Sequence, residues 1–252
     1  MKRKALLISL AVALVAMMAL GVTLAYFTDK DQATNTFVAG NVKIALHEDN
    51  KEGKVDEDYQ AWLADQVLIP GNNKTNTIAK NVTVENTGNN AAYVWIKQYI
   101  PAALDVPTNA SQNSLHVNFY GRLDTYWADK PAYWEAGQTS AYTTGLWDHT
   151  HEFTVGNDSG YLGQETVDGV LYNVYVFFYA DKLASGATTT SCIHQVYMDK
   201  DVKAGTEPNS YKLKDGTDNY TGPWKLIIKA YAIQADGFAD VYAAYAAYDG
   251  EA

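Results

Sequence analysis

Four segments of the 252-residue chain have strand-forming patterns, either alternation of apolar with polar residues or a run of β-branched and aromatic residues, and these patterns constrain the fold more than any other feature. Successive side chains of a β-strand point to opposite faces, so the alternation predicts strands with one buried face. The four segments are 37–46, 78–100, 170–181 and 224–235. They are spread over the whole chain after its first 36 residues, so we expect strands throughout.

Each segment predicts a particular strand. The 37–46 segment turns Val42, Ile44 and Leu46 to one face. The 78–100 segment has two alternating runs separated by the turn sequence Asn-Thr-Gly-Asn-Asn, which predicts a hairpin. The 170–181 segment is rich in β-branched and aromatic residues and predicts a central strand. The 224–235 segment turns four residues inward, namely Leu226, Ile228, Ala230 and Ala232.

Helical signals are short. The 56–66 stretch predicts two or three turns, which the Pro70–Gly71 turn ends. The C-terminal stretch is rich in alanine and spaces Tyr242, Tyr245 and Ala246 as a helix would. Residues 101–161 lack lasting periodicity and predict long decorated loops with short strands. The fold class that follows is all-β: a single jelly-roll-like antiparallel β-sandwich with short helices and long loops.

The first 25 residues have the pattern of a secretory signal peptide. A basic start at residues 1–4 precedes an apolar run at 5–20, and small residues stand at Thr23 and Ala25. We expect cleavage between Ala25 and Tyr26 and a secreted protein. A retained membrane anchor is the alternative, because the apolar run approaches the length of a short membrane span. In the favoured reading, the chain contacts a membrane only before cleavage.

Charge and cysteine content exclude several classes of function. Removing the signal peptide takes away three of the 19 basic residues, so the net charge becomes 16 − 29 = −13. Such an acidic chain repels phosphate backbones, so no nucleic-acid partner is expected. Cys192 is the one cysteine, which excludes an internal disulfide. We expect Cys192 in the core, with an exposed reactive thiol as the alternative.

Three stretches of the chain together resemble the TasA/camelysin family. They are AYFTDKDQATNTFVAGNVKIAL, LIPGNNKTNTIAKNVTVENTGNNAAYVWIK and IIKAYAIQADGFADVYAAY. The signal peptide is of the type that a dedicated ER-type signal peptidase cuts in that family, whereas the 101–161 region matches poorly. The resemblance implies a jelly-roll sandwich, secreted by Gram-positive bacteria, that builds protein fibres of the biofilm matrix by donor-strand pairing.

A donor strand also has a physical basis in these residues. After cleavage, residues 26–36 form a free polar arm whose expected donor residues are Tyr26, Phe27, Thr28 and the adjoining Phe37. An unpaired sheet edge recruits such a segment through its backbone groups. Gly40 is the expected hinge, because glycine adopts unusual backbone angles. The alternative is that residues 37–46 form the first strand of their own sandwich; both roles are compatible if only 26–36 is donated.

Catalytic motifs are incomplete. Camelysin-like relatives are described as metallopeptidases, and a zinc peptidase of that class needs the motif H-E-x-x-H. The pairs His47–Glu48 and His151–Glu152 lack the second histidine, because Lys51 and Val155 stand at its position. No G-x-S-x-G serine motif is present. We therefore expect no enzyme, no cofactor and no defined metal centre. A surface ion near His149 and His151, or in the acidic stretch 48–58, stays open beside the simpler reading of solvated loops.

Aromatic residues leave a second class of function open. Six tryptophans and 19 tyrosines are present, and Trp127, Trp134 and Trp147 fall in predicted loops. Exposed rings on a sandwich can stack on sugars, so a monomeric carbohydrate-binding module is the alternative function. The same rings could instead pack loops or line subunit contacts.

These observations give three parts: a signal peptide at 1–25, a donor arm at 26–36 and a sandwich domain at 37–252. The expected function is a secreted structural fibre subunit that assembles head to tail with copies of itself. Other matrix proteins or polysaccharide are possible further partners. Acid, or cations that screen the negative charge, should promote assembly. The acceptor edge, and whether this subunit is major, minor or inhibitory, stay open.

Overall fold

The computed structural model describes residues 28–30, 42–49, 57–58, 60, 66–72, 74–119, 147–148 and 160–249. Strands dominate this part of the chain, and the longest helix in it has nine residues. The predicted all-β class is therefore confirmed. No helix among these residues has the length and apolar character that crossing a membrane requires.

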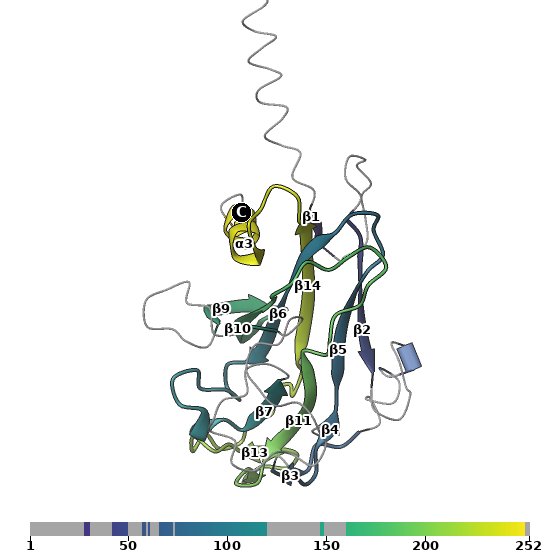
Figure 1. The fold of residues 1–252 in the computed structure, drawn as a ribbon. Coiled ribbons are helices and arrows are strands. Elements are labelled where there is room, and N and C mark those ends of the chain that lie inside the picture. Colours follow the sequence, from purple (N-terminus) through teal and green to yellow (C-terminus); the bar gives the residue numbers. More distant parts are fainter. Residues whose placement is uncertain are drawn as a thin grey trace, which may run out of the picture.

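The main sheet has six strands, all antiparallel to their neighbours (Figure 1). They are β1 (Thr28–Lys30), β14 (Ile227–Gln234), β6 (Ala92–Pro101), β10 (Val170–Tyr179), β9 (Tyr161–Val167) and β8 (Trp147–Asp148). β14 lies between β1 and β6, while β10 pairs with β6, β9 and β8. The central position predicted for the 170–181 segment is thus confirmed.

The facing layer is assembled from smaller sheets. Its strands are β2 (Ile44–Asp49), β5 (Asn81–Asn86), β11 (Ile193–Asp199), β7 (Leu115–Phe119), β3 (Pro70–Gly71) and β4 (Ile78–Ala79). β2 pairs with β5, and β11 pairs with β7, β3 and β4. Backbone bonds from Thr189 to Val84 and from Cys192 to Val82 join β5 to the chain before β11. A short ladder of β12 (Lys203–Ala204) with β13 (Tyr211–Lys212), and the 3-10 turn η1 (Ala110–Gln112), complete the described elements.

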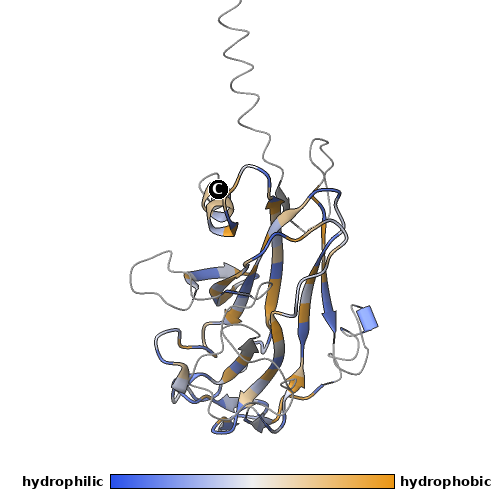
Figure 2. Cartoon of the chain, in the orientation of Figure 1, coloured by the Kyte–Doolittle hydropathy of each residue, from blue (hydrophilic) through white to orange (hydrophobic). Residues whose placement is uncertain are grey.

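The core lies between these two layers. Val42, Ile44, Val82 and Val84 on one side meet the inward residues of β6, β10 and β14 on the other. Figure 2 shows the alternation of apolar and polar residues along the strands. The predicted inward residues of the 224–235 segment all belong to this core or pack against it. Cys192 is fully buried, and burial raises the pKa of its thiol, so the core prediction for it is confirmed.

A second apolar layer covers the outer face of the main sheet. The helix α3 (Val241–Asp249) buries Val241, Ala244 and Tyr245 against Trp95 and Phe178. Trp95 meets the rings of Tyr245 and Tyr248 edge-on at 5.4 and 5.2 Å. The predicted C-terminal helix is confirmed, although Ala246, expected on the same face as Tyr245, is exposed. Because β6 is covered on both faces, it is apolar at nearly every position.

The hairpin predicted within residues 78–100 is wrong. β5 pairs with β2, while β6 pairs with β10 and β14 of the opposite layer. The buried Asn86 side chain donates to the carbonyls of Asn90 and Leu183, and its Oδ1 accepts from the Gly88 N–H. These bonds hold the turn as a crossing between layers. The chain does turn at the predicted sequence, but local sequence does not determine which sheet the chain enters next.

The remaining local predictions have mixed outcomes. Within the 56–66 stretch, the described residues Glu57, Asp58 and Gln60 are helical, as expected. The 101–161 region contains η1, β7 and β8 where it is described. The jelly-roll connectivity stays a prediction, because the observed strand orders establish the two layers and not that specific wiring.

Candidate functional site at the edge of the main sheet

The edge of the main sheet at β14 is covered over part of its length. β1 places Thr28 opposite Ile233, Asp29 opposite Ala232 and Lys30 opposite Tyr231. Within the described residues, no strand pairs with β14 on this side from Ile227 to Ala230. Unpaired backbone donors and acceptors along a strand edge are able to bind another extended segment.

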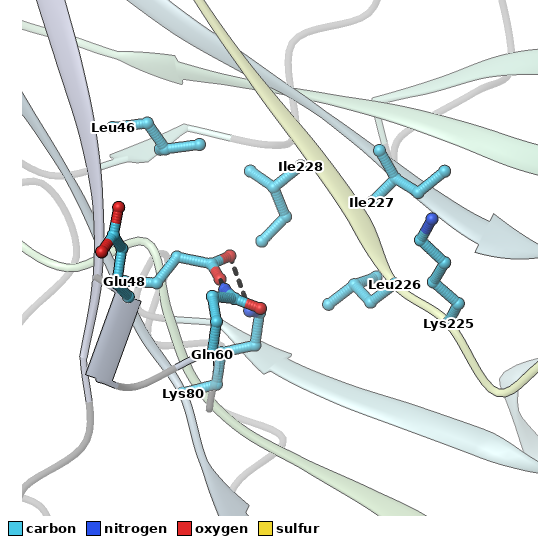
Figure 3. A pocket seen from close by; sticks show the side chains of 9 residues that line it. Leu46, Glu48, Gln60, Lys80, Lys225, Leu226, Ile227 and Ile228 are labelled. Atoms are coloured by element: carbon cyan, nitrogen blue, oxygen red, sulfur yellow. Dashed lines mark hydrogen bonds and ion pairs between the residues drawn. The ribbon is translucent and has the colours of Figure 1, made fainter. Parts of the chain in front are cut away.

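A groove lies beside residues Ile227 and Ile228 of β14 (Figure 3). Its volume is about 580 Å³. Nine residues line it: Leu46, Glu48, Glu57, Gln60, Lys80, Lys225, Leu226, Ile227 and Ile228. They come from β2, the helical residues Glu57 and Gln60, the start of β14, the segment before it and the residue between β4 and β5. Leu46, Leu226 and Ile228 also pack against the main core, so the groove has an apolar wall continuous with that core.

Opposite the apolar wall, the groove carries an ion pair. Lys80 Nζ lies 2.6 Å from Glu48 Oε1, and the Gln60 amide donates to the other oxygen of Glu48. Lys80 is only 4% exposed. Burial lowers the pKa of its ammonium group below the usual 10.5, and the charge of Glu48 and its hydrogen bond oppose that shift. Neither residue was singled out for such a pair by the sequence analysis.

The arrangement is suited to an extended peptide. A strand laid along β14 would exchange backbone hydrogen bonds with it, and its alternate side chains would face the groove. The alternation would set the register, since a slip of one residue turns the other set of side chains inward. No group of three or more His, Cys, Asp or Glu side chains suited to a metal ion occurs among the described residues.

Of the predicted donor residues, only Thr28 lies among the residues that the structure describes. Thr28 lies in β1, opposite Ile233 of its own chain. Ala25 and Tyr26 at the cleavage site, the donor residues Phe27 and Phe37, and the hinge Gly40 lie outside the described residues. Pairing of the arm with a second copy therefore stays a prediction, as does the role of Gly40.

The incomplete histidine motifs are only partly described. His47 Nε2 lies 3.0 Å from Glu85 Oε2, while Glu48 faces the groove and pairs with Lys80. Consecutive side chains of β2 thus contact different partners, as expected for a strand. His149, His151 and most of the acidic 48–58 stretch lie outside the described residues, so an ion there stays open.

Trp147 does not form an exposed platform. It lies in β8, is 2% exposed and donates its indole N–H to the Thr190 carbonyl at 2.8 Å. Its predicted loop position is therefore wrong, because the two residues of β8 pair with Phe178 and Tyr179 of the central strand. Trp127 and Trp134 lie outside the described residues, so sugar binding by them stays untested.

Comparison of the chain with protein-family models, with curated proteins and with solved structures found no match in any of the three. The TasA/camelysin resemblance thus rests on the three sequence stretches alone.

Proposed function

We propose that this protein is a secreted structural subunit of an extracellular fibre, and that the mature N-terminal arm of one copy pairs with β14 of the next. The observation that carries the proposal is the partial cover of β14: a segment of the predicted arm already runs beside three of its residues. The rest of that edge adjoins a groove with an apolar wall.

The arm and the edge agree in length. Continuing the β1 register by single residues would place Ala33 opposite Ile228 and Thr34 opposite Ile227. In the other direction, Phe27 would lie opposite Gln234, the last residue of β14. Residues 27–34 thus span β14 from end to end. An arm donated by a second copy in this register would take the place of β1 and would also pair with residues 227–230, which have no partner on this side among the described residues.

The directions of the strands also permit a simple repeat. Ile44, at the start of β2, lies opposite Asn86, and one turn later Ala92 lies opposite Gln234. The start of β2 and the end of β14 therefore share one end of the sandwich (Figure 1). An arm leaving β2 away from its own subunit would meet the β14 of a copy displaced along that direction, antiparallel as in β1. Such contacts do not close on themselves and generate a filament.

Electron microscopy tests the function directly. Protein that begins at Tyr26 should form filaments, whereas protein that begins at Phe37 should stay monomeric. Monomers from both proteins would contradict the fibre proposal and favour the carbohydrate-binding alternative.

Disulfide trapping tests the register between copies. One copy carries Ala33→Cys and another carries Ile228→Cys, and the native Cys192 is buried and does not compete. Because the two introduced thiols are on different chains, a covalent dimer of the two requires pairing between chains. The control replaces Ile228→Cys by Leu171→Cys, on the far side of the sheet, and should give no specific dimer. Equal yields from both pairs would contradict the proposed register.

A further inference from the structure

Two aliphatic side chains project from the segment that leads into β3. Val67 is 75% exposed and Ile69 is 52% exposed, while Leu68 between them packs against the core. Large apolar residues exposed among the described part of the chain are otherwise limited to Leu162 and Leu171, at 37% and 46%. Val67 and Ile69 are thus the two most exposed, and they form what we call the β3 patch.

The β3 patch is held in place by its surroundings. The next residues, Pro70 and Gly71, pair in parallel with Met198 and Asp199 of β11. A tight turn follows, in which Asn72 and Thr75 exchange backbone bonds and the Asn76 side chain donates to the Pro70 carbonyl. Any side chain at Gly71 would meet the Thr75 carbonyl oxygen at 2.2 Å. The two aliphatic residues are therefore presented by an anchored segment.

The position of the β3 patch in the molecule indicates its partner. β3 lies at the end of the sandwich opposite to β1 and the end of β14 (Figure 1). In the head-to-tail repeat described above, the end of one subunit from which the arm departs faces the β3 end of the next. Contiguous exposed apolar residues mark contact sites more often than scattered ones do.

We propose that the β3 patch is a second contact between copies of this chain, buried against the arm-bearing end of the preceding subunit. The inference rests on the proposed fibre function. It also answers a question that donor-strand pairing leaves open. An arm that moves from its own β14 to a neighbour's gives up the three pairs of β1 and forms them again on the neighbour, so only the pairs beyond these three are gained. Contacts present only between subunits must favour the polymer, and the β3 patch supplies an apolar one.

The test compares two double variants of the protein that begins at Tyr26. Val67→Ser with Ile69→Ser removes the β3 patch, and Leu162→Ser with Leu171→Ser is the matched control elsewhere on the surface. Sedimentation gives the concentration of unassembled protein at equilibrium with filaments. We expect it to rise at least tenfold in the patch variant and to change less than twofold in the control. An unchanged value in the patch variant, with circular dichroism showing both variants folded, would overturn the inference.

A conservative variant distinguishes the loss of an apolar contact from a defect in folding. Val67→Ile with Ile69→Val keeps the apolar surface and should assemble as the parent does. If it loses assembly as the serine variant does, contact through apolar burial is wrong.

A peptide experiment distinguishes failure of the fibre proposal from failure of the β3 patch proposal. A synthetic 26–36 peptide with Ala33→Cys is added to the Tyr26-starting protein carrying Ile228→Cys, with and without the patch substitutions. Equal disulfide capture by both proteins, together with weaker assembly of the patch variant, supports the β3 patch. No capture by either protein would contradict the strand-pairing proposal. Equal capture with equal assembly would overturn the patch alone.

Discussion

The two edges of the main sheet are covered in different ways. β9 reaches β10 through the two-residue turn Asp168–Gly169, and six residue pairs follow. β14 is covered by β1, which lies about two hundred residues earlier in the chain and pairs at three positions. A local turn closes the first edge at low entropic cost, whereas the second depends on a distant segment. In the proposed fibre, this difference favours β14 over β10 as the strand that accepts the arm of another chain.

The outer side of β9 is also protected against pairing. A register shift interrupts the β9–β10 ladder between Val174 and Tyr175. Gln164, Glu165 and Thr166 of β9 are exposed and polar. Bulges and charged side chains are features that keep natural sheet edges from joining other sheets. The β14–β6 ladder, by contrast, runs without a shift from Ile227 to Gln234.

The groove beside β14 should respond most strongly to a single substitution. Lys80→Met removes an ammonium group that pairs with the largely buried Glu48, and removing one member of a buried pair is costly. We expect a loss of about 2 to 4 kcal/mol in the free energy of unfolding, measured by urea denaturation. The double variant Glu48→Gln, Lys80→Met should recover most of that loss. A double variant as unstable as the single one would mean that the pair is not what holds this wall of the groove.

The β9 edge should depend on its turn. Gly169 has φ +78° and follows Asp168, also at positive φ. Nothing lies within 4 Å of a Cβ added at Gly169, so any cost of Gly169→Val comes from backbone strain and not from a clash. A β-branched residue there should cost about 1 to 3 kcal/mol. Thermal unfolding measures the cost, and the folded variant should still form filaments. Lost filaments in a fully folded variant would break the distinction between the edges.

Removing the arm should have a small effect on the fold. β1 contributes three residue pairs, and the hydrogen bonds it gains are largely offset by the entropy of ordering so short a segment. Protein beginning at Phe37 should therefore lose less than about 1 kcal/mol of unfolding free energy relative to protein beginning at Tyr26. A much larger loss would indicate that β1 is an integral strand of its own sandwich and is not free to be donated.

The same difference between local and distant pairing explains which features the sequence could predict and which it could not. The inward face of β14 followed from alternation at Ile228, Ala230 and Ala232, because a strand's two faces are a local property. The crossing at Asn86 could not be predicted, since its amide bonds Leu183, nearly a hundred residues away. For the same reason, β14 could not be proposed from sequence as the acceptor edge.

The candidate contact residues show that sequence alone does not predict which single side chains are exposed. Val67 and Ile69 have the same apolar character as Leu68, and only the packing of the folded chain separates the exposed pair from the partly buried residue between them. Lys80 stands between Ala79 and Asn81, where a solvated lysine would be the ordinary expectation. Its burial depends on Glu48 from another strand. Sequence therefore proposes the arm, while the surfaces that would receive it could be proposed only from the fold.

The smallest expected effect concerns acid, which should promote assembly through the negative charge but also acts on the fold. His116 Nε2 lies 2.9 Å from Asp199, whose carboxylate also binds Lys214 at 2.7 Å, and the imidazole stacks on Tyr197. Burial lowers the pKa of His116 below 6.5; its bond with Asp199 opposes the shift, and the charges of Lys214 and Asp105 act in opposite senses. The unfolded chain therefore takes up a proton first as the pH falls below about 6.5, and the folded state loses stability.

His116→Gln separates these two effects of acid, because the glutamine amide can still donate to Asp199 but does not titrate. Unfolding free energies measured between pH 7 and 5.5 should fall less steeply in the variant than in the parent. Filament formation should respond to acid equally in both, because the response arises from the net charge and the β14 edge, and His116 lies in β7 of the other layer. If the unfolding free energies of variant and parent depend on pH equally, His116 does not contribute to the loss of stability in acid. Loss of the acid response in assembly would instead link this layer to the β14 edge and weaken the contrast between local and distant cover.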